Sequence, residues 1–318
     1  MTHVLITGAD GFIGRALTRR LAAAGVALHG RTVQRLTLCD LRLSEAPSAP
    51  HVTHVAGSVA DPEVVRRATA DQPDIVFHLA SVPSGQSEAD FEQGLSVNVQ
   101  GLIGLLDTLR RQGHRPTVVF TSSIAVFGAP LPEHIDDDTP LRPTLSYGAH
   151  KQMAEIFIAD LTRRGALSGR SVRLPGIVAR PPSPTGALSA FSSELIRALA
   201  AGQPYTCPVS ADATLWLLSL QGCVDNLLHA AAPQLALPPG LTAWTLPAQR
   251  LRVGQLVQAF EQRRPGCSQQ LTFAPDATLE AQFGRLPPLD TTAAQAAGFC
   301  HDGDVGTLVE RAVQAIAT

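Results

Sequence analysis

A glycine-rich turn close to the amino terminus places the strongest constraint on the fold. An apolar run over residues 4–7 leads directly into Gly8-Ala9-Asp10-Gly11-Phe12-Ile13-Gly14, and leucines at helical spacing follow. This order predicts a strand, a tight turn and a helix. Such glycines also occur in ordinary turns, but at a first strand-to-helix junction they favour a site for the pyrophosphate of a dinucleotide. The contacts would come from Gly8, Asp10, Gly11, Phe12, Ile13 and Gly14.

Four further apolar runs alternate with helical patterns, at residues 36–40, 52–56, 75–79 and 117–121. Strands that alternate with helices imply right-handed crossovers and a parallel sheet. We therefore predict an α/β fold of the Rossmann type, with a doubly wound parallel sheet and a smaller, mostly C-terminal substrate-binding domain. Ligands of such sheets bind beyond the carboxyl ends of the strands, so the residues that follow each strand are candidates for the site.

The run over residues 36–40 ends in a carboxylate. Asp40 can accept hydrogen bonds from the adenosine ribose hydroxyls and would repel a 2′-phosphate, which favours NAD over NADP. Arg42 is an opposing signal, because a nearby arginine can accommodate that phosphate, and we give Asp40 the greater weight. Ser58 and Val59 follow the next run and are candidates for contact with the adenine edge.

The loop over residues 81–86 follows the run at 75–79 and is a candidate substrate wall, with Ser81, Ser84 and Gly85 as contacts. Loops rich in Ser, Pro and Gly are commonly only loops, so both interpretations stay open. Asn98 in the next helical segment is either a buried structural amide or a member of a proton relay.

Tyr147 and Lys151 form the pair that predicts the chemistry. Lys151 is the single lysine in a chain with 24 arginines, and it lies four residues after one of two tyrosines. This spacing puts both side chains on one helix face. An adjacent ammonium lowers the pKa of a phenol from its usual value near ~10, so Tyr147 could exchange a proton with a substrate hydroxyl. Ser122 and Ser123 follow the strand over residues 117–121. They would bring a hydroxyl to the carboxyl edge of the sheet, in the same crevice as Tyr147.

The composition and net charge of the chain argue against several classes of protein. The net charge of −2 and the absence of a basic block argue against nucleic acid or anionic membrane partners. No leader sequence is evident, and no apolar run reaches the ~20 residues that span a bilayer. The five cysteines and ten histidines show no metal-ligand spacing, so we expect no metal and no disulfide framework. A cytoplasmic protein with a small-molecule substrate is the resulting expectation.

Taken together, the motifs resemble the extended short-chain dehydrogenase/reductase family, which includes NAD-dependent epimerases and dehydratases. They are T-G-x-x-G-F-I-G at residues 7–14, Asp40, His78-Leu79-Ala80, Asn98, Thr121-Ser122-Ser123, Tyr147-x-x-x-Lys151, and Arg173-Leu174-Pro175 as the sixth strand. The resemblance implies that Ser123, Tyr147 and Lys151 are catalytic. It also implies cofactor contacts from Leu79, Ala80, Asn98, Tyr147, Lys151, Pro175 and Ile177. Among these, Lys151 would hold the nicotinamide ribose.

The resemblance also predicts the domain organisation. Residues 1–175 would form the NAD-binding domain with the catalytic residues, and residues 176–318 would mainly bind substrate, with some segments returning to the Rossmann sheet. The Pro-rich stretch at 181–184 is expected to be a linker. The sequence does not give the oligomeric state, but members of this family often pair through the helices that hold Asn98 and Tyr147, so a homodimer is one alternative.

Departures from the family pattern narrow the activity. Ile124 and Ala125 stand where sugar dehydratases have an Asp-Glu pair, and Thr214-Leu215-Trp216 stands where nucleotide-sugar enzymes usually have an arginine for the diphosphate. Other motifs resemble a branch that oxidises the C2 hydroxyl of a four-carbon sugar acid, namely Phe77-His78-Leu79-Ala80, Ser84-Gly85, Arg180-Pro181, Cys207-Pro208-Val209 and Leu215-Trp216-Leu217. Arg180 is our candidate for the substrate carboxylate, and the backbone groups of Ser84 and Gly85 and the side chain of Arg197 are the other candidates. The alternatives are another sugar acid or uronate, a nucleotide-sugar epimerase, and an NAD-sensing regulator without catalysis.

Overall fold

The computed structural model describes residues 2–23, 25–44, 46–182 and 190–316. The chain divides into two compact units. The first contains Met1–Val126, Pro143–Arg173 and Val224–Trp244, and the second contains Phe127–Arg142, Leu174–Cys223 and Thr245–Thr318. Each unit is therefore assembled from segments that are distant in sequence, and each is described here by itself.

The first unit is built on one sheet with the strand order β11-β7-β6-β5-β1-β3-β2, in which β4 also pairs with β3. Parallel pairing joins β1 to β3 and β5, β3 to β4, and β5 to β6, whereas β2 is antiparallel to β3. The strands are β1 (Thr2–Thr7), β2 (Ala27–Leu28), β3 (Arg31–Asp40), β4 (Val52–Ala56), β5 (Ile75–His78), β6 (Thr117–Ser123), β7 (Ser168–Leu174) and β11 (Trp244–Thr245). The predicted parallel α/β sheet is confirmed.

The register brings the carboxyl ends of the central strands to one edge of the sheet. Thr7 at the end of β1 lies opposite both Cys39 and His78, and His78 lies opposite Phe120. The segments that follow these strands therefore meet at this edge although they are far apart in sequence. This is the edge at which the sequence predicts a ligand.

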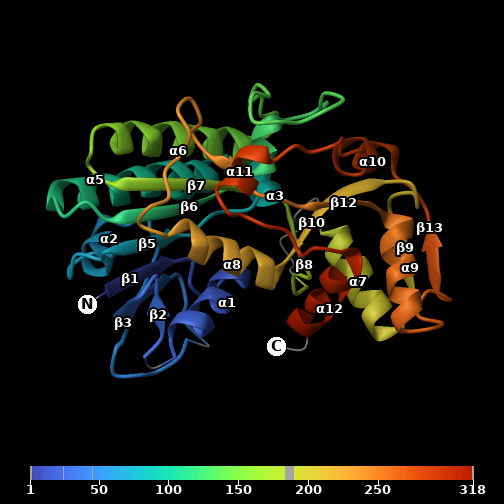
Figure 1. Cartoon of the computed structure of the whole chain (residues 1–318), viewed down its shortest axis with the longest axis horizontal. Helices are drawn as coiled ribbons and strands as arrows, with labels where there is room; N and C mark the ends of the chain where they lie inside the picture. Colours follow the sequence, from blue (N-terminus) through green and yellow to red (C-terminus); the bar gives the residue numbers. More distant parts are fainter. Residues whose placement is uncertain (1, 24, 45, 183–189, 317–318) are drawn as a thin grey trace. The chain divides into compact units, whose positions relative to one another are not determined.

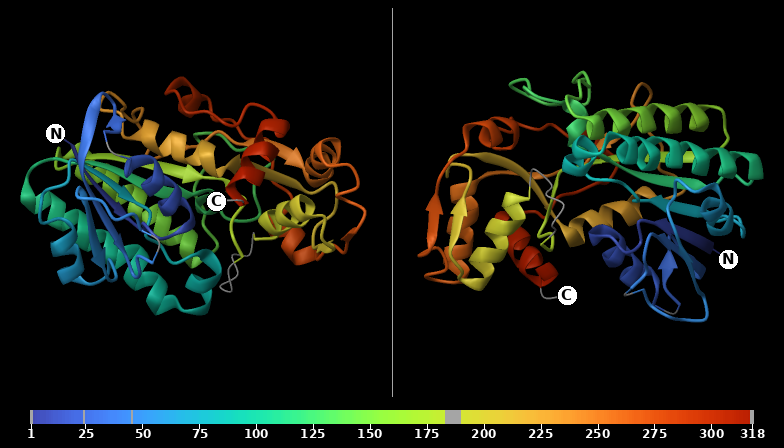
Figure 2. Two further views of the ribbon diagram at one scale, coloured as in Figure 1. Left: turned by 90° about the horizontal axis from the view of Figure 1, so that it is seen from below. Right: turned by 180° about the vertical axis from the view of Figure 1, so that it is seen from behind.

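Helices cover both faces of this sheet, as a doubly wound fold requires (Figures 1 and 2). One face carries α2, α5 and α6, and the other carries α1 and the residues of α8 that belong to the first unit. The helical segments are α1 (Phe12–Leu21), α2 (Pro62–Ala68), α3 (Ser84–Ala89), α4 (Phe91–Leu95), η1 (Ser96–Gly101), α5 (Leu102–Gln112), η2 (Ile124–Phe127), α6 (Ser146–Arg163) and α8 (Leu220–Ala230). Because both faces are covered, the central strands carry buried apolar runs, such as residues 4–6 of β1 and 118–120 of β6, and all of β1 is buried.

The helices also bear on membrane association. Within the described ranges, the structure contains no helix whose length and apolar character would let it cross a bilayer.

The predicted strands agree with the structure in the first half of the chain and differ at one later boundary. β4 has the predicted bounds, and β3 and β6 are longer than predicted. The sixth strand, predicted at residues 173–175, was placed wrongly: β7 runs over Ser168–Leu174 and ends before Pro175. Proline has no N–H group for a strand ladder, so it ends this strand.

The second unit contains two small sheets and its own core. β10 (Thr214–Ser219) pairs with β8 (Gly176–Val178) and β12 (Gln249–Arg252), and β9 (Tyr205–Cys207) pairs with β13 (Leu271–Phe273). Its helices are α7 (Phe191–Ala201), α9 (Val253–Arg263), α10 (Ala277–Phe283), α11 (Thr292–Ala296) and α12 (Val305–Ile316). Apolar side chains of α7, α9, α12 and β10 fill one core cluster. Of the predicted linker, residues 183 and 184 lie outside the described residues.

Candidate active site

The glycine turn is fixed by contacts that exclude larger side chains. Gly8 has a φ of +72° and donates its N–H to the Cys39 carbonyl at 2.9 Å. A Cβ atom on Gly8 would lie 2.6 Å from the nitrogen of Ala80, and one on Gly14 would lie 2.0 Å from the oxygen of Gly8. The fold itself therefore requires glycine at positions 8 and 14, because α1 and β5 approach the turn so closely.

Gly11 differs from these two glycines. It is exposed, its φ is −73°, and a Cβ there would lie 3.3 Å from its nearest neighbour, the Gly8 oxygen. The fold would accept a small side chain at this position after a slight adjustment. A glycine at the exposed start of α1 instead leaves room for a ligand that approaches the backbone, so the turn fits the pyrophosphate of a dinucleotide. Asp10, Phe12 and Ile13 lie in the same segment.

Two carboxylates lie beside this turn. Asp40 at the end of β3 accepts hydrogen bonds from the N–H groups of Asp10, at 2.8 Å, and of Leu41, at 2.6 Å. Burial raises the pKa of Asp40, and these hydrogen bonds oppose that shift. The Asp10 side chain forms an ion pair with Arg15 at 3.0 Å. The structure thus brings Asp40 to the glycine turn, as the sequence predicted.

The ends of β6 and α6 bring the proposed catalytic side chains together. Ser123 is the last residue of β6, and its Oγ accepts the N–H of Ala125 at 3.1 Å. Within the described part of the chain, the hydroxyl proton of Ser123 has no acceptor. The first turn of α6 packs against this segment at Gly148, where a Cβ would lie 2.4 Å from the Ala125 oxygen. Tyr147 is the residue before this contact and is half-buried.

Lys151 is buried beneath Tyr147. Its Nζ lies 5.3 Å from the centre of the Tyr147 ring, 4.7 Å from that of Phe120, and donates to the Thr121 carbonyl at 2.7 Å. Burial lowers the pKa of Lys151 to about 7, and the charge of Glu155 opposes that shift. An ammonium has three N–H donors, so two remain for a ligand once Thr121 is bound. The predicted one-face arrangement of Tyr147 and Lys151 is present.

Two charged residues that were not predicted as site residues lie next to this pair: Glu155, and Arg173, which was named above only as part of a strand motif. Glu155 follows Lys151 by one further turn of α6 and is fully buried, where it forms an ion pair with Arg173 on β7 at 2.8 Å. Ser122, which we predicted as a substrate contact, is buried and donates its hydroxyl to Glu155. The signal for Glu155 was its i+4 spacing from Lys151, the same spacing that links Tyr147 to Lys151.

Asn98 lies in η1, and its amide is fully engaged. It accepts from Ser81 Oγ at 3.0 Å and from the Val82 N–H at 2.8 Å, and it donates to the Val82 carbonyl at 3.1 Å and to Ser87 Oγ at 3.3 Å. These bonds use both donors and both acceptor positions of the amide. Asn98 therefore holds the loop after β5 in place, which is the structural one of its two predicted roles. Its relay role stays a prediction.

The remaining predicted contacts lie in several segments. Leu79 and Ala80 adjoin the glycine turn, where the Leu79 N–H donates to the Thr7 carbonyl at 3.0 Å. Ser84 and Gly85 begin α3. Ser58 and Val59 follow β4, and Ser58 Oγ accepts the Ala60 N–H at 3.1 Å. All of these lie in the first unit, whereas Pro175, Ile177 and Arg180 belong to the second.

Arg180 lies just after β8 and is partly buried. Its N–H donates to Ser193 Oγ at 3.0 Å, and its carbonyl accepts from the guanidinium of Arg197. Its charge acts on the buried thiol of Cys223. The second unit thus holds the Arg180 backbone firmly, and a substrate contact from its guanidinium stays a prediction.

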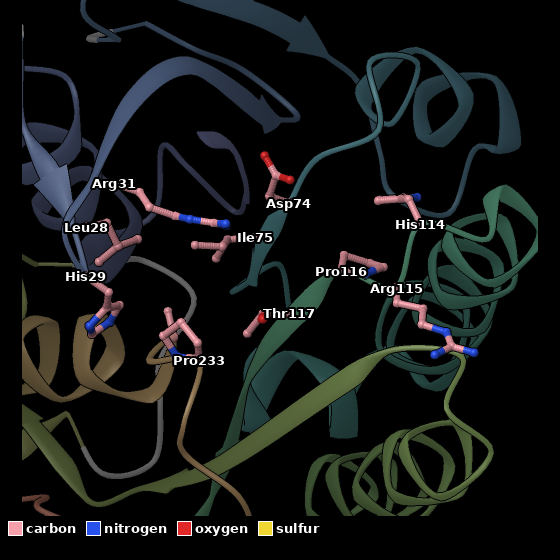
Figure 3. A pocket seen from close by; sticks show the side chains of 11 residues that line it. Leu28, His29, Arg31, Asp74, Ile75, His114, Arg115, Pro116, Thr117 and Pro233 are labelled. Atoms are coloured by element: carbon pink, nitrogen blue, oxygen red, sulfur yellow. The ribbon is translucent and has the colours of Figure 1, made fainter. Parts of the chain in front are cut away.

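A cavity of about 260 Å³ lies at the opposite edge of the sheet (Figure 3). Ile75 and Thr117, the first residues of β5 and β6, contribute to its lining, and Arg31 points toward Ile75 and Asp74. It therefore lies at the amino ends of the strands and is separate from the glycine turn and from Tyr147.

Comparison with known proteins agrees with this geometry. The model of the NAD dependent epimerase/dehydratase family matches residues 4–216. A Cupriavidus necator protein named D-erythronate dehydrogenase is 44% identical over 230 residues, which are 71% of each chain. A Haemophilus influenzae protein of the same name is 31% identical over 317 residues, which are 98% of each chain. The crystal structure of the nucleoside-diphosphate-sugar epimerase from Agrobacterium tumefaciens has a TM-score of 0.90 at 31% identity, covering 98% of this chain and 94% of that one.

The glycine turn at the carboxyl edge of a parallel sheet and the match over most of the chain lead to one conclusion. The chain belongs to the NAD dependent epimerase/dehydratase family, and it is an NAD-dependent oxidoreductase. The family resemblance inferred from the sequence motifs is confirmed.

Two alanine substitutions in the turn should have different effects. Gly14→Ala should lower the melting temperature by several degrees or prevent folding, because the new methyl group overlaps the Gly8 oxygen. Gly11→Ala should leave the melting temperature nearly unchanged but weaken NAD binding by about tenfold or more, since it narrows the approach to the backbone. Thermal denaturation and calorimetric titration with NAD measure the two effects. Unchanged NAD affinity in folded Gly11→Ala would contradict this assignment.

Proposed function

We propose that this enzyme oxidises the C2 hydroxyl of a four-carbon sugar acid with NAD, converting D-erythronate to 2-dehydro-D-erythronate. The observation that carries the proposal is the placement of Ser123, Tyr147 and the buried Lys151 at the carboxyl ends of the strands, in the same unit as the glycine turn. Two relatives that cover 71% and 98% of the chain are named D-erythronate dehydrogenase, which supports the choice of substrate.

In the proposed mechanism, Tyr147 is the general base. The Lys151 ammonium, 5.3 Å from the phenol ring, stabilises the phenolate and lowers the pKa of Tyr147. Tyr147 then removes the proton of the C2 hydroxyl as the carbon–hydrogen bond at C2 breaks and the carbonyl forms. Ser123 donates its hydroxyl proton to the reacting oxygen and fixes its position. NAD, held by the glycine turn and Lys151, would supply the hydride acceptor for the two electrons that the substrate loses.

The chain's own residues suit the two ends of this cofactor. The glycine turn over residues 8–14 would hold the pyrophosphate, and Asp40 would accept hydrogen bonds from the adenosine ribose. The remaining N–H groups of Lys151 would bind the nicotinamide ribose. The additional contacts we propose are Ser58, Val59, Leu79, Ala80, Asn98, Pro175 and Ile177.

The substrate carboxylate requires cationic or N–H donors. We propose Arg180 as the main partner, with Ser81, Ser84 and Gly85 on the loop after β5 as further contacts. Under this proposal residues 1–175 bind the cofactor and carry the catalytic groups, and most of residues 176–318 bind substrate. Ser122 would support the site through its bond to Glu155 instead of contacting the substrate directly.

Two alternative functions compete with this proposal. Another sugar acid or uronate would use the same catalytic groups, because the chemistry at the hydroxyl is unchanged. Epimerisation of a nucleotide sugar is suggested by the likeness to the nucleoside-diphosphate-sugar epimerase structure. Against it, Trp216 is buried in the second unit and donates its indole N–H to the Pro287 carbonyl at 2.8 Å, so it offers no charge to a diphosphate.

Replacing the proposed base gives the most direct test. Tyr147→Phe should lower kcat for D-erythronate by about 10² or more, because general base catalysis contributes roughly 10²–10⁴. NADH formation at 340 nm, measured with a panel of four- to six-carbon sugar acids, reports turnover and substrate choice together. The other tyrosine supplies a matched control: Tyr205 in the second unit donates to Glu194 at 3.1 Å, and Tyr205→Phe should retain activity. Full activity of Tyr147→Phe would refute the mechanism, and a nucleotide-sugar isomer formed without net NADH would favour the epimerase.

The cofactor preference is expected to depend on Asp40. Asp40→Ser removes the carboxylate, and it should raise KM for NAD by about tenfold or more while lowering KM for NADP, because a hydrogen bond to a charged group contributes roughly 1.5–3 kcal/mol. Steady-state kinetics with both cofactors measure the change. Asp71→Asn, which alters an exposed carboxylate paired with Arg35 at 2.8 Å, serves as the control. A wild-type enzyme that prefers NADP would contradict our assignment of Asp40.

We also propose that two copies pair through α5 and α6. Ile103 on α5 and Met153 and Ile156 on α6 are large apolar side chains with 43%, 45% and 56% of their surface exposed. Ile156→Asp should convert a dimer to a monomer, because it would bury a charge in this interface. Light scattering coupled to gel filtration measures the mass, and Ile316→Asp, at the end of α12, is the control. A monomeric wild-type protein would contradict the proposal.

A further inference from the structure

A buried carboxylate lies two helical turns after Tyr147 on the same face of α6. Glu155 has no exposed surface and accepts hydrogen bonds from three other segments of the first unit. Arg173 donates two, at 3.0 and 2.8 Å, Thr242 donates one at 3.2 Å, and Ser122 donates its hydroxyl. A carboxylate removed from water is costly unless the protein replaces its lost hydrogen bonds, and here the described residues supply at least four.

These bonds fix how α6 meets the end of β6. The carbonyl of Thr121 accepts from Lys151 at 2.7 Å, and the hydroxyl of the next residue, Ser122, donates to Glu155. Two successive residues of β6 are thereby bonded to two successive turns of one helix face. Ser123 is the following residue, so the position of its hydroxyl relative to α6 is set by this pair of bonds.

Glu155 also balances the charge around Lys151. Lys151 and Arg173 are both buried, with 3% and 4% of their surface exposed. Two histidines interact electrostatically with Lys151: burial lowers the pKa of His78 to about 3, and burial also lowers the pKa of His150, which favours the neutral form of both rings. Among the described residues, Glu155 is the charged group that favours the ammonium form of Lys151, and it raises the pKa that burial lowers.

We propose that Glu155 is a positioning residue of the catalytic site: it sets the register of α6 on β6 and supplies the negative charge that balances the buried Lys151 ammonium. The catalytic part of this inference rests on the proposed roles of Ser123, Tyr147 and Lys151. Glu155 itself does not contact the reacting atoms. It acts on Tyr147 through Lys151, because a protonated Lys151 is what makes the phenol acidic.

A measurement on the cofactor-free protein tests the charge balance without turnover. Lys151 is the single lysine of the chain, so protein labelled with [ε-¹³C]lysine gives one lysine signal, whose chemical shift against pH reports its protonation. In the wild type this titration should lie near pH 7. In Glu155→Gln it should move down by about one pH unit or more, the size of shift that a lost opposite charge produces. An unmoved titration in the folded variant would overturn the proposal.

Two further variants separate charge balance from folding. Glu155→Gln leaves Arg173 buried without its anion, which typically costs roughly 3–5 kcal/mol, so this variant could unfold. The double variant Glu155→Gln/Arg173→Gln removes both charges and should restore the melting temperature while keeping the lowered lysine titration. Asp160→Asn makes the same carboxylate-to-amide change at an exposed ion pair on α6, 2.6 Å from Arg163, and should leave the titration unchanged.

Kinetics then test the link to catalysis. Without the balancing charge, Lys151 is less protonated, the pKa of Tyr147 rises, and the acidic limb of the pH profile of kcat should move to higher pH. At pH 8 the double variant should lose at least about tenfold in kcat with a smaller change in KM. A lower melting temperature with an unmoved lysine titration and pH profile would mean that Glu155 is only structural. If the wild type forms no NADH from any sugar acid but its lysine shifts as expected, the proposed function fails and the charge balance stands.

Discussion

The structure of the site depends on keeping one ammonium charged inside a protein core. Lys151 lies under the Phe120 ring and donates to a backbone carbonyl, and burial there lowers its pKa to about 7. Glu155 offsets this cost, and it is itself stabilised by Arg173 and by hydroxyl groups on neighbouring segments. The close packing of α6 against the end of β6 is therefore an electrostatic requirement as well as a hydrophobic one, because the buried ammonium and the buried carboxylate each need polar partners on neighbouring strands.

The glycine turn of the same unit depends on a steric requirement instead of an electrostatic one. Gly8 and Gly14 allow the turn to pack against β5 and the start of α1, and Gly11 leaves the backbone open on the outside. Parallel pairing of β1, β3, β5 and β6 then brings this turn, Asp40 and the end of β6 to one edge of the sheet. The Asp40 carboxylate and the Ser123 hydroxyl thereby lie at strand ends of one sheet, although they are separated by long stretches of sequence.

Membership of the family defines the cofactor class, whereas the substrate has to be inferred from individual residues of this chain. Ile124 and Ala125 offer no proton donor for dehydration, and buried Trp216 offers no charge to a diphosphate. These features, together with relatives named D-erythronate dehydrogenase, favour simple oxidation of a small acid over the alternatives. Under the proposed mechanism the catalytic groups would act on an alcohol of any such substrate, so discrimination among acids would depend on the carboxylate partner and the loop after β5.

The amino-acid sequence by itself determined the α/β class and the order of the apolar runs that form the parallel strands. It also determined the glycine turn and the pairing of Tyr147 with Lys151. These features are local, since turn geometry and the i, i+4 spacing of a helix act over a few residues. The tertiary structure decided what long-range packing controls. It engaged the whole amide of Asn98 with the loop after β5 and turned Ser122 toward Glu155. It also joined Glu155 to Arg173, because only the folded sheet brings α6 and β7 close enough for a buried carboxylate to find its cation.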